Sequence, residues 1–478
     1  MNKKEILDSP IICRDYETSG LNQFFDQPLT SCAKRYVGGE VVDELYLSAK
    51  CESHRLPSPI ALFVNGLSSC SLESGIPLNT LMDLDNKFNA MYPRDFILAY
   101  NAKFDFGFSY TGAFQQLTNS NWYSWKTEHS VLCGLEILKA IYGFNLGSKI
   151  QFPLDSLNSP SFSLERVCHE NGILYQAHNA SEDVNATLAV FEMMKSDSPE
   201  IVQHAMQYSQ KKSVKNLINQ NSFVCAAIGF GEHLHGRALA PILFCNNGSD
   251  VLCVDIGQVH PSQIKNIHSW EISRQLARGK IDDIFVLLPL NKQKVIFAEE
   301  HYRVCYSHSE LSLTELRERA NVARENKALK ELASDAFKLF EITNRPSADT
   351  SLELSIFDDF VQPNESQFIK DFNAVDWQNR WDLLRSTDLI EPSNRIARLA
   401  RRVIIENCPD SVPNSLLDAY RGFCNQRLFD LQSGRDQRWI NFSRVLTELQ
   451  ELRERFPDQE LRLRELEEYY DSRLAVSP

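Results

Sequence analysis

The residues Ile11 to Thr18 constrain this chain more than any other stretch, because a short apolar run there ends in two acidic residues, Asp15 and Glu17. The run favours a β-strand, and side chains two positions apart in a strand point to the same face. Two carboxylates on one face repel each other, and a bound divalent cation with oxygen ligands relieves that repulsion. The alternative is a strand end that carries two solvated acids. The pair alone does not distinguish a metal site from such a strand end.

Length and composition place the chain among ordinary globular proteins. Its 478 residues suffice for about two to four domains, and no apolar run is long enough to cross a bilayer. The N-terminus lacks a signal-peptide pattern. The 12 cysteines are scattered, without zinc spacing, which predicts a reducing cytoplasm. A net charge of −13 argues against indiscriminate binding of polyanions, although a groove needs only local positive charge.

The first part of the chain alternates strand and helix patterns. Residues 11 to 50 read as three strands, with a hairpin at Gly38-Gly39-Glu40. A continuous apolar strand follows at 96–100, and helical spacing recurs at 77–91, 132–142, 164–171 and 181–195. This order predicts a mixed α/β sheet over residues 1–198.

The rest of the chain changes character twice. Residues 199–350 begin with a helical pattern at 200–217 and continue with five strand patterns between glycine and asparagine turns, at 223–228, 240–244, 251–256, 284–288 and 295–298. We therefore expect a β-rich domain there. Residues 351–478 are helical and charged, and their last leucine-rich stretch predicts an antiparallel helix pair, because Pro457 interrupts a coiled coil.

Three further residues complete an acidic constellation. Asp105 follows the buried strand, and His178 lies five residues before Asp183, at the start of a helix for which Ser181 is the expected N-cap. Two metal ions about 3.5–4 Å apart, as used in phosphodiester hydrolysis, need several converging carboxylates. A neutral histidine can accept the proton of the attacking water. Each element is weak alone, and a single His-x4-Asp is usually a surface loop. Together they indicate metal-dependent phosphodiester hydrolysis.

These motifs resemble those of a known nuclease family. Asp-Tyr-Glu-Thr at 15–18, Asn-x-x-Phe-Asp at 101–105 and His-x4-Asp at 178–183 are similar to the three motifs of the DEDDh 3′→5′ exonucleases, which have a ribonuclease H-like fold. Segments at 56–67, 160–165, 211–215, 236–243 and 254–257 resemble the bacterial exodeoxyribonuclease I family. The resemblance implies a DEDDh exonuclease domain at 1–198, an SH3-like β-rich domain at 199–350 and an all-helical C-terminal domain at 351–478.

The resemblance also implies a role for each matching residue. Four carboxylates would hold two Mg²⁺ ions, for which Mn²⁺ can substitute, and His178 would be the general base; the four are Asp15, Glu17, Asp105 and Asp183. Residues expected at the substrate are Glu17, Thr18, Phe104, Lys211, Lys212, Lys215 and Arg237. The three lysines are equally well explained as a solvated helix face.

Other positions carry weaker expectations. Tyr16 alternates with the two acids, so we expect it to pack into the sheet. Arg395, Arg398 and Arg402 recur at helical spacing beside Arg401, a cluster that favours phosphate contact. The sequence departs from the family pattern at Ser19, where a larger residue is common, and at Asn179, where aspartate is usual; neither change removes an expected ligand.

The expected function is degradation of single-stranded DNA from its 3′ end to mononucleotides, in DNA repair or recombination. Two rivals stay open. One is a 3′→5′ exoribonuclease on the same core, since discrimination rests on contacts to the 2′-OH. The other is a non-catalytic single-strand-binding adaptor. The resemblance implies a cytoplasmic monomer with no membrane partner, and a basic pocket on the second domain for the acidic C-terminal tail of single-stranded DNA-binding protein. The sequence does not locate that pocket.

Overall fold

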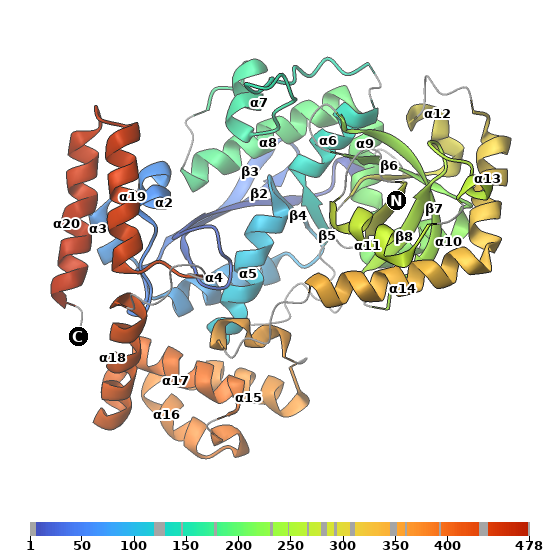
Figure 1. Ribbon diagram of the computed structural model, residues 1–478. Coiled ribbons are helices and arrows are strands. Elements are labelled where there is room, and N and C mark those ends of the chain that lie inside the picture. Colours follow the sequence, from blue (N-terminus) through green and yellow to red (C-terminus); the bar gives the residue numbers. More distant parts are fainter. Residues whose placement is uncertain are drawn as a thin grey trace.

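The structure is a computed structural model that describes most of the chain. The described residues are 6–118, 130–144, 147–175, 179–229, 233–246, 248–264, 267–278, 284–290, 294–305, 311–344, 351–358, 361–391, 393–429 and 438–476. Figure 1 shows three neighbouring parts: a mixed sheet with helices around it, a second sheet flanked by long helices, and a group of helices that includes the C-terminal end.

The first sheet has five strands in the order β3-β2-β1-β4-β5. Their bounds are β1 (Ile11–Thr18), β2 (Pro28–Val37), β3 (Glu40–Ser48), β4 (Phe96–Ala99) and β5 (Ser130–Cys133). β2 pairs antiparallel with both β1 and β3, while β1, β4 and β5 run parallel, so the predicted mixed sheet is confirmed. Gly38 and Gly39 have positive φ angles of 61° and 96°, as a two-residue hairpin requires.

Seven helices accompany this sheet in the described residues. They are α2 (Pro59–Asn65), α3 (Ser69–Ser74), α4 (Leu78–Met91), α5 (Ala102–Gln115), α6 (Gly134–Phe144), α7 (Leu164–Glu170) and α8 (Ala180–Asp197). The helices predicted at 77–91, 164–171 and 181–195 are confirmed. The helix predicted at 132–142 begins too early, because residues 130–133 pair with β4 as a strand. A short apolar run fits either structure, and here the neighbouring strand decides.

The second sheet is antiparallel throughout its described strands, in the order β10-β6-β7-β8-β9. Its strands are β6 (Val224–Ile228), β7 (His235–Phe244), β8 (Asp250–Asp255), β9 (Phe285–Pro289) and β10 (Ile296–Ala298), as the five strand patterns predicted. The helices around it are α9 (Pro199–Gln207), α10 (Lys211–Gln220), α11 (Ser269–Arg278), α12 (Tyr302–Cys305), α13 (Leu313–Glu325) and α14 (Lys327–Asn344).

The single helix predicted at 200–217 is wrong, since the chain breaks there into α9 and α10. The break falls at residues 208–210, where the hydroxyl of Ser209 donates to the carbonyl of Met206 at 2.8 Å. A serine side chain that bonds to a nearby carbonyl competes with the helical ladder, which favours an end at this point.

One apolar core joins the two sheets. It contains residues of β1 and α8 as well as residues of β6, β7 and α14. At the junction the rings of Phe144 and Phe297 lie 5.2 Å apart, centre to centre. The two sheets therefore belong to one continuous apolar cluster. The boundary at residue 198, like the one at 350, stays a prediction.

The C-terminal part is helical, as predicted. Its helices are α15 (Pro363–Ala374), α16 (Trp377–Arg385), α17 (Arg395–Asn407), α18 (Asn414–Phe429), α19 (Phe442–Arg455) and α20 (Glu460–Val476). α19 and α20 lie side by side, so the predicted helix pair is confirmed (Figure 1). Two apolar clusters attach this part to the first sheet's helices, one through Phe114 of α5 and one through Leu62 of α2.

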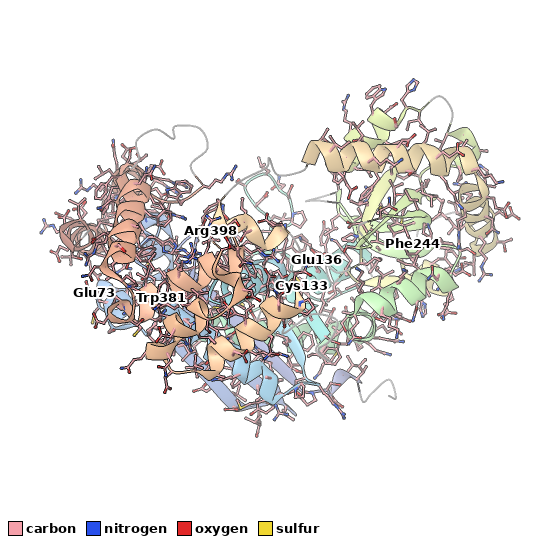
Figure 2. All side chains as sticks on the ribbon, turned by 90° about the horizontal axis from the view of Figure 1, so that it is seen from below. Glu73, Cys133, Glu136, Phe244, Trp381 and Arg398 are labelled. Atoms are coloured by element: carbon pink, nitrogen blue, oxygen red, sulfur yellow. The ribbon has the colours of Figure 1, made fainter. Side chains whose placement is uncertain are left out.

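Figure 2 shows how the parts are ordered across the molecule. Arg398 and Trp381 of the helical part lie on one side, Phe244 of the second sheet lies on the other, and Cys133 and Glu136 lie between them. None of the helices described is long and apolar enough to span a membrane. The cysteines that the structure describes are free thiols.

Candidate active site

The side chains of β1 point to two opposite faces of the sheet. Arg14 and Tyr16 point to the face covered by α4, where both bond to Asp85: Arg14 Nη2 lies 2.6 Å from Asp85 Oδ1, and the Tyr16 hydroxyl donates to Oδ2 at 2.8 Å. Ser31 of β2 donates to the same carboxylate at 2.8 Å. Tyr16 is buried, so its predicted packing into the sheet is confirmed. This network fixes the strand and leaves Asp15 and Glu17 on the opposite face.

Helix α8 brings Asp183 to that opposite face. The side chain of Asn179 caps the helix by accepting from the backbone N–H of Ser181 at 3.0 Å. The expected cap at Ser181 is therefore wrong, because the helix already begins at Ala180. Lys34 of β2 donates to the Asn185 side chain at 2.8 Å and so ties the first turns of α8 to the sheet. An asparagine at 179 thus does the capping that an aspartate would do.

Three carboxylates converge at the end of β1. One oxygen each from Asp15, Glu17 and Asp183 lies within 4.8 Å of the other two. The hydroxyl of Tyr175 donates to Asp183 Oδ1 at 2.7 Å and orients that carboxylate. Asp105, from the first turn of α5, accepts a bond from the backbone N–H of Tyr16 at 3.2 Å. The structure thus gathers three of the four predicted ligands into one cluster and fixes the fourth against the backbone of β1.

Burial and mutual repulsion disfavour the charged forms of these acids. Burial is the largest cause that raises the pKa of Glu17 to about 8, and Asp183 and Asp105 add to it. Burial likewise raises the pKa of Asp105 to about 7, against the lowering effect of Arg14. The pKa of Asp15 is raised well above its ordinary value by burial and then by Asp105 and Glu17. Holding ionised carboxylates this close together costs free energy unless a positive charge binds among them.

The donor set fits a divalent cation. Glu17 Oε1 is buried and finds no hydrogen-bond partner among the residues that the structure describes. A buried carboxylate oxygen without a partner is expensive, and a cation would satisfy it. Because all the converging donors are carboxylate oxygens, the site suits a hard ion of the Mg²⁺ or Mn²⁺ type.

The acids open into a cleft of about 850 Å³. Its walls come from the segment after β1, from α2, from Phe104 of α5 and from the helical part, and they include Thr18, Leu21, Asn22, Ile60, Val64, Asn65, Arg438, Ile440 and Arg444. Ser58 before α2 donates to Glu448 Oε2 of α19 at 2.5 Å, and Arg444 Nε donates to Glu448 Oε1 at 2.8 Å. The helical part therefore closes one side of the cleft.

The predicted substrate residues separate into two groups. Glu17, Thr18 and Phe104 line the cleft. Lys211, Lys212 and Lys215 are exposed on α10 and are not among the cleft residues; Lys215 Nζ instead lies 5.5 Å from the ring centre of Phe244. Contact of the lysines with DNA stays a prediction.

Arg237 has a structural environment. Its side chain is 1% exposed, and its Nη1 lies 3.7 Å from Asp255 Oδ2 on the neighbouring strand. This burial favours a structural role, and contact of Arg237 with the substrate stays a prediction. His178, the expected general base, lies outside the described residues, and its role stays a prediction.

The arginine cluster of α17 is mostly internal. Arg395 Nη1 donates to the carbonyl of Ser355 at 2.7 Å, and Arg402 Nη1 donates to Glu353 at 2.8 Å. Both side chains are buried, and Arg398 is exposed. Helical spacing located the face correctly, but it cannot tell a solvated face from one that another helix covers.

Two cations that line the cleft, Arg438 and Arg444, were not predicted from the sequence. Both lie more than half the chain away from Asp15 in sequence, and neither belongs to a motif. The packing of α19 against α2 places this part of the chain beside the cleft.

Comparison with known proteins finds relatives of this chain. No protein-family model matches the chain. Exodeoxyribonuclease I of Buchnera aphidicola (subspecies Baizongia pistaciae) is 28% identical over 256 residues, which cover 51% of this chain and 52% of that protein. Exodeoxyribonuclease I of Escherichia coli K12 is 26% identical over 220 residues, 44% of this chain and 45% of that protein. The aligned sequence thus spans about half the length of these curated relatives.

The fold agrees over a much longer stretch. Exonuclease I of Methylocaldum szegediense matches with a TM-score of 0.80 at 18% identity, over 97% of this chain and 99% of that one. Escherichia coli exonuclease I in complex with a dA16 oligonucleotide matches with a TM-score of 0.81 at 20% identity, over 97% of this chain and all of that one. The chain therefore has the fold of bacterial exonuclease I over almost its whole length, and part of its sequence is similar to that of bacterial exodeoxyribonuclease I.

Proposed function

We propose that this chain is a metal-dependent 3′→5′ exonuclease that removes mononucleotides from single-stranded DNA. The convergence of the Asp15, Glu17 and Asp183 carboxylates within 4.8 Å carries the proposal. Further support comes from the cleft over these acids and from the shared fold. One similar structure is the zinc-bound form of an Escherichia coli exonuclease I complex with single-stranded DNA, at 19% identity.

We assign the metal ligands by the chemistry of the donors. Asp15, Glu17 and Asp183 would hold one ion, and Asp105 would share in a second. Divalent cations bound there would act as Lewis acids on the scissile phosphate. We propose Mg²⁺, with Mn²⁺ as a substitute, because every donor is a carboxylate oxygen.

The chain's own side chains would bind and orient the end of the strand. Thr18 and Phe104 border the acids in the cleft, where the terminal nucleotide would lie. A ring such as that of Phe104 offers a face on which a base stacks. Arg438 and Arg444 supply positive charge on the far wall, and guanidinium groups suit phosphate oxygens.

Two residues would manage the proton and the ligand geometry. We propose His178 as the general base, since an imidazole titrates near neutral pH and can take the proton of the attacking water. Tyr175 would position Asp183 through the bond that its hydroxyl donates. A group that orients a metal ligand commonly affects metal affinity without touching the substrate.

The proposal also covers the cellular location, the biological role and the partners of the chain. Free thiols fit a reducing, cytoplasmic location, and the role would lie in DNA repair or recombination. One similar structure is an ExoI/SSB-Ct complex, at 20% identity, which supports the C-terminal tail of single-stranded DNA-binding protein as a partner. We propose that the chain acts as a monomer with that partner.

The test compares substrates and metal. A 5′-labelled single-stranded DNA should shorten from its 3′ end, EDTA should stop the reaction, and a blunt duplex should be a poor substrate. Preference for RNA would favour the exoribonuclease rival, and binding without hydrolysis would favour the adaptor. Asp15→Asn should abolish hydrolysis but leave strand binding measurable, whereas Asp8→Asn, an exposed control, should behave as wild type.

A further inference from the structure

A second cavity lies in the helical part, away from the catalytic acids. It has a volume of about 510 Å³, opens to the surface and is lined by α17, α18 and the segment 351–353. Apolar side chains make most of its wall, among them Ile405, Leu416, Phe423 and Trp439. Cavities of this size with a few converging polar groups are the usual form of small-molecule sites.

The polar groups of this cavity are buried arginines with donors to spare. Arg402 Nη1 and Arg427 Nη1 both donate to the same oxygen of Glu353, at 2.8 and 2.7 Å. The side chains of Arg402 and Arg427 are 4% and 6% exposed. In the part of the chain that the structure covers, Nε and Nη2 of both arginines have no hydrogen-bond partner.

Two other carboxylates nearby have partners, and only one of their oxygens is left over. Glu52 Oε1 accepts from Gln116 at 2.9 Å, while Glu52 Oε2, 3.3 Å from Arg55, makes no hydrogen bond to the described residues. Glu406 accepts from Ser53 at 2.9 Å and also bonds to the Tyr420 hydroxyl. Buried guanidinium donors without acceptors are costly, so an anionic group in the cavity would lower the free energy of this arrangement.

Flat rings lie directly beside these donors. The Arg427 guanidinium lies 4.8 Å from the ring centre of Trp439 and 5.9 Å from that of Phe423. Phe423 is 40% exposed, and Arg398, also exposed, adds positive charge at the cavity wall. Figure 2 marks Arg398 in the helical part. The cavity therefore offers an anion site next to an aromatic surface.

The cavity is linked to the catalytic cleft through neighbouring residues. Trp439 lines the cavity, and Arg438, the residue before it, lines the cleft. We infer that the cavity is a nucleotide-binding subsite, in which Arg402 and Arg427 hold a phosphate and Trp439 and Phe423 contact the base. The choice of a nucleotide as the ligand rests on the proposed function. The anion site itself is argued from the arginines of the cavity alone. The nucleotide is either a free 5′-mononucleotide or one unit of the bound strand.

Two substitutions test the site in the full chain. Ala419→Trp puts a large ring at an exposed position that lines the cavity, and Ser415→Trp puts the same ring at an exposed position of α18 outside it. Arg398→Gln removes positive charge without changing the buried pair. The probes are dAMP and inorganic phosphate, titrated calorimetrically in EDTA so that no hydrolysis occurs.

We expect dAMP to bind wild type and Ser415→Trp alike. Ala419→Trp should weaken dAMP binding about tenfold or more, because the indole ring fills space that the nucleotide would occupy. Arg398→Gln should weaken both dAMP and inorganic phosphate severalfold. Equal dAMP affinity in all four proteins, or no dAMP binding by wild type, would overturn the inference.

Further arms separate the possible sources of the nucleotide. If it is a unit of the strand, Ala419→Trp should weaken binding of a long single strand but not of a trinucleotide. If it is a free mononucleotide, Ala419→Trp should instead relieve inhibition by dAMP. An acidic peptide that binds the cavity in place of dAMP would overturn the nucleotide assignment. Binding of dAMP is measured without metal. A protein that binds dAMP in this cavity but hydrolyses no DNA would therefore refute the proposed function and leave this inference standing.

Discussion

The carboxylate cluster should make the metal-free protein less stable than it would be without one of its charges. Glu17→Gln removes one charge at nearly constant volume. The pKa of Glu17 rises from 4.5 to about 8 in the folded chain, chiefly through burial. The folded state therefore holds its proton more tightly than the unfolded state does. The resulting penalty is absent below pH 4.5, grows through the window between the two values and is complete above about pH 8.

The size of the effect follows from these values. One pKa unit corresponds to about 1.4 kcal/mol, so Glu17 titrating alone would cost the folded state about 5 kcal/mol above pH 8. Asp15 and Asp105 carry part of this repulsion and remain in the variant, and the buried glutamine amide also needs partners. We therefore expect Glu17→Gln to recover on the order of 2 kcal/mol, which raises Tm by about 4–8 °C for a domain of this size.

The assay is thermal unfolding followed by circular dichroism. In EDTA near pH 8, Glu17→Gln should melt above wild type, and near pH 4.5 the difference should vanish. Glu182→Gln, an exposed neighbour of Asp183 on α8, is the matched control and should change little at either pH. With saturating Mn²⁺ the order should reverse, because a ligand that binds only the folded state stabilises it. Equal melting of wild type and Glu17→Gln in EDTA near pH 8 would refute the reasoning.

Three further changes probe other parts of the account. His178→Ala should lower the rate in single-turnover assays by about 10²–10⁴-fold, which is the usual contribution of a positioned base. Binding of Mn²⁺ should stay unchanged, and its loss would make His178 a metal ligand instead. Tyr175→Phe should weaken Mn²⁺ binding about tenfold by calorimetry, because Asp183 loses its orienting bond; unchanged affinity would make that bond irrelevant to the site. Asp85→Asn should cost about 3–5 kcal/mol in urea unfolding, because a buried arginine loses its charge partner. Asp83→Asn, at a half-buried position of α4 whose partner Lys87 is exposed, should cost much less; similar losses in both would contradict this role.

Sequence reasoning worked best where chemistry and periodicity are local. The alternation in β1 placed Asp15 and Glu17 on one face and Tyr16 on the other, as the structure shows. The glycines at 38 and 39 located a hairpin, and the five strand patterns after residue 220 all became strands of the second sheet. These features depend on neighbours a few residues apart.

Several errors arose where distant contacts decide. Residues 130–133 could pair with β4 or start a helix, and only the neighbouring strand settles this. The arginine spacing of α17 did not show that Arg395 and Arg402 are buried, or that Arg402 is bonded to Glu353. Arg438 and Arg444 line the catalytic cleft because the helical part folds back onto α2. Such contacts leave no periodic trace in the sequence.

We propose that the carboxylate cluster on β1 and α8 binds metal and receives the 3′ end of a single strand. The most direct measurement is an anomalous difference map from crystals soaked in Mn²⁺ with a short single-stranded DNA that resists hydrolysis. We predict Mn²⁺ peaks among Asp15, Glu17, Asp183 and Asp105, with the last phosphate of the strand against them. Crystals that bind the strand with its 3′ end elsewhere, or that show no Mn²⁺ at these carboxylates, would contradict it.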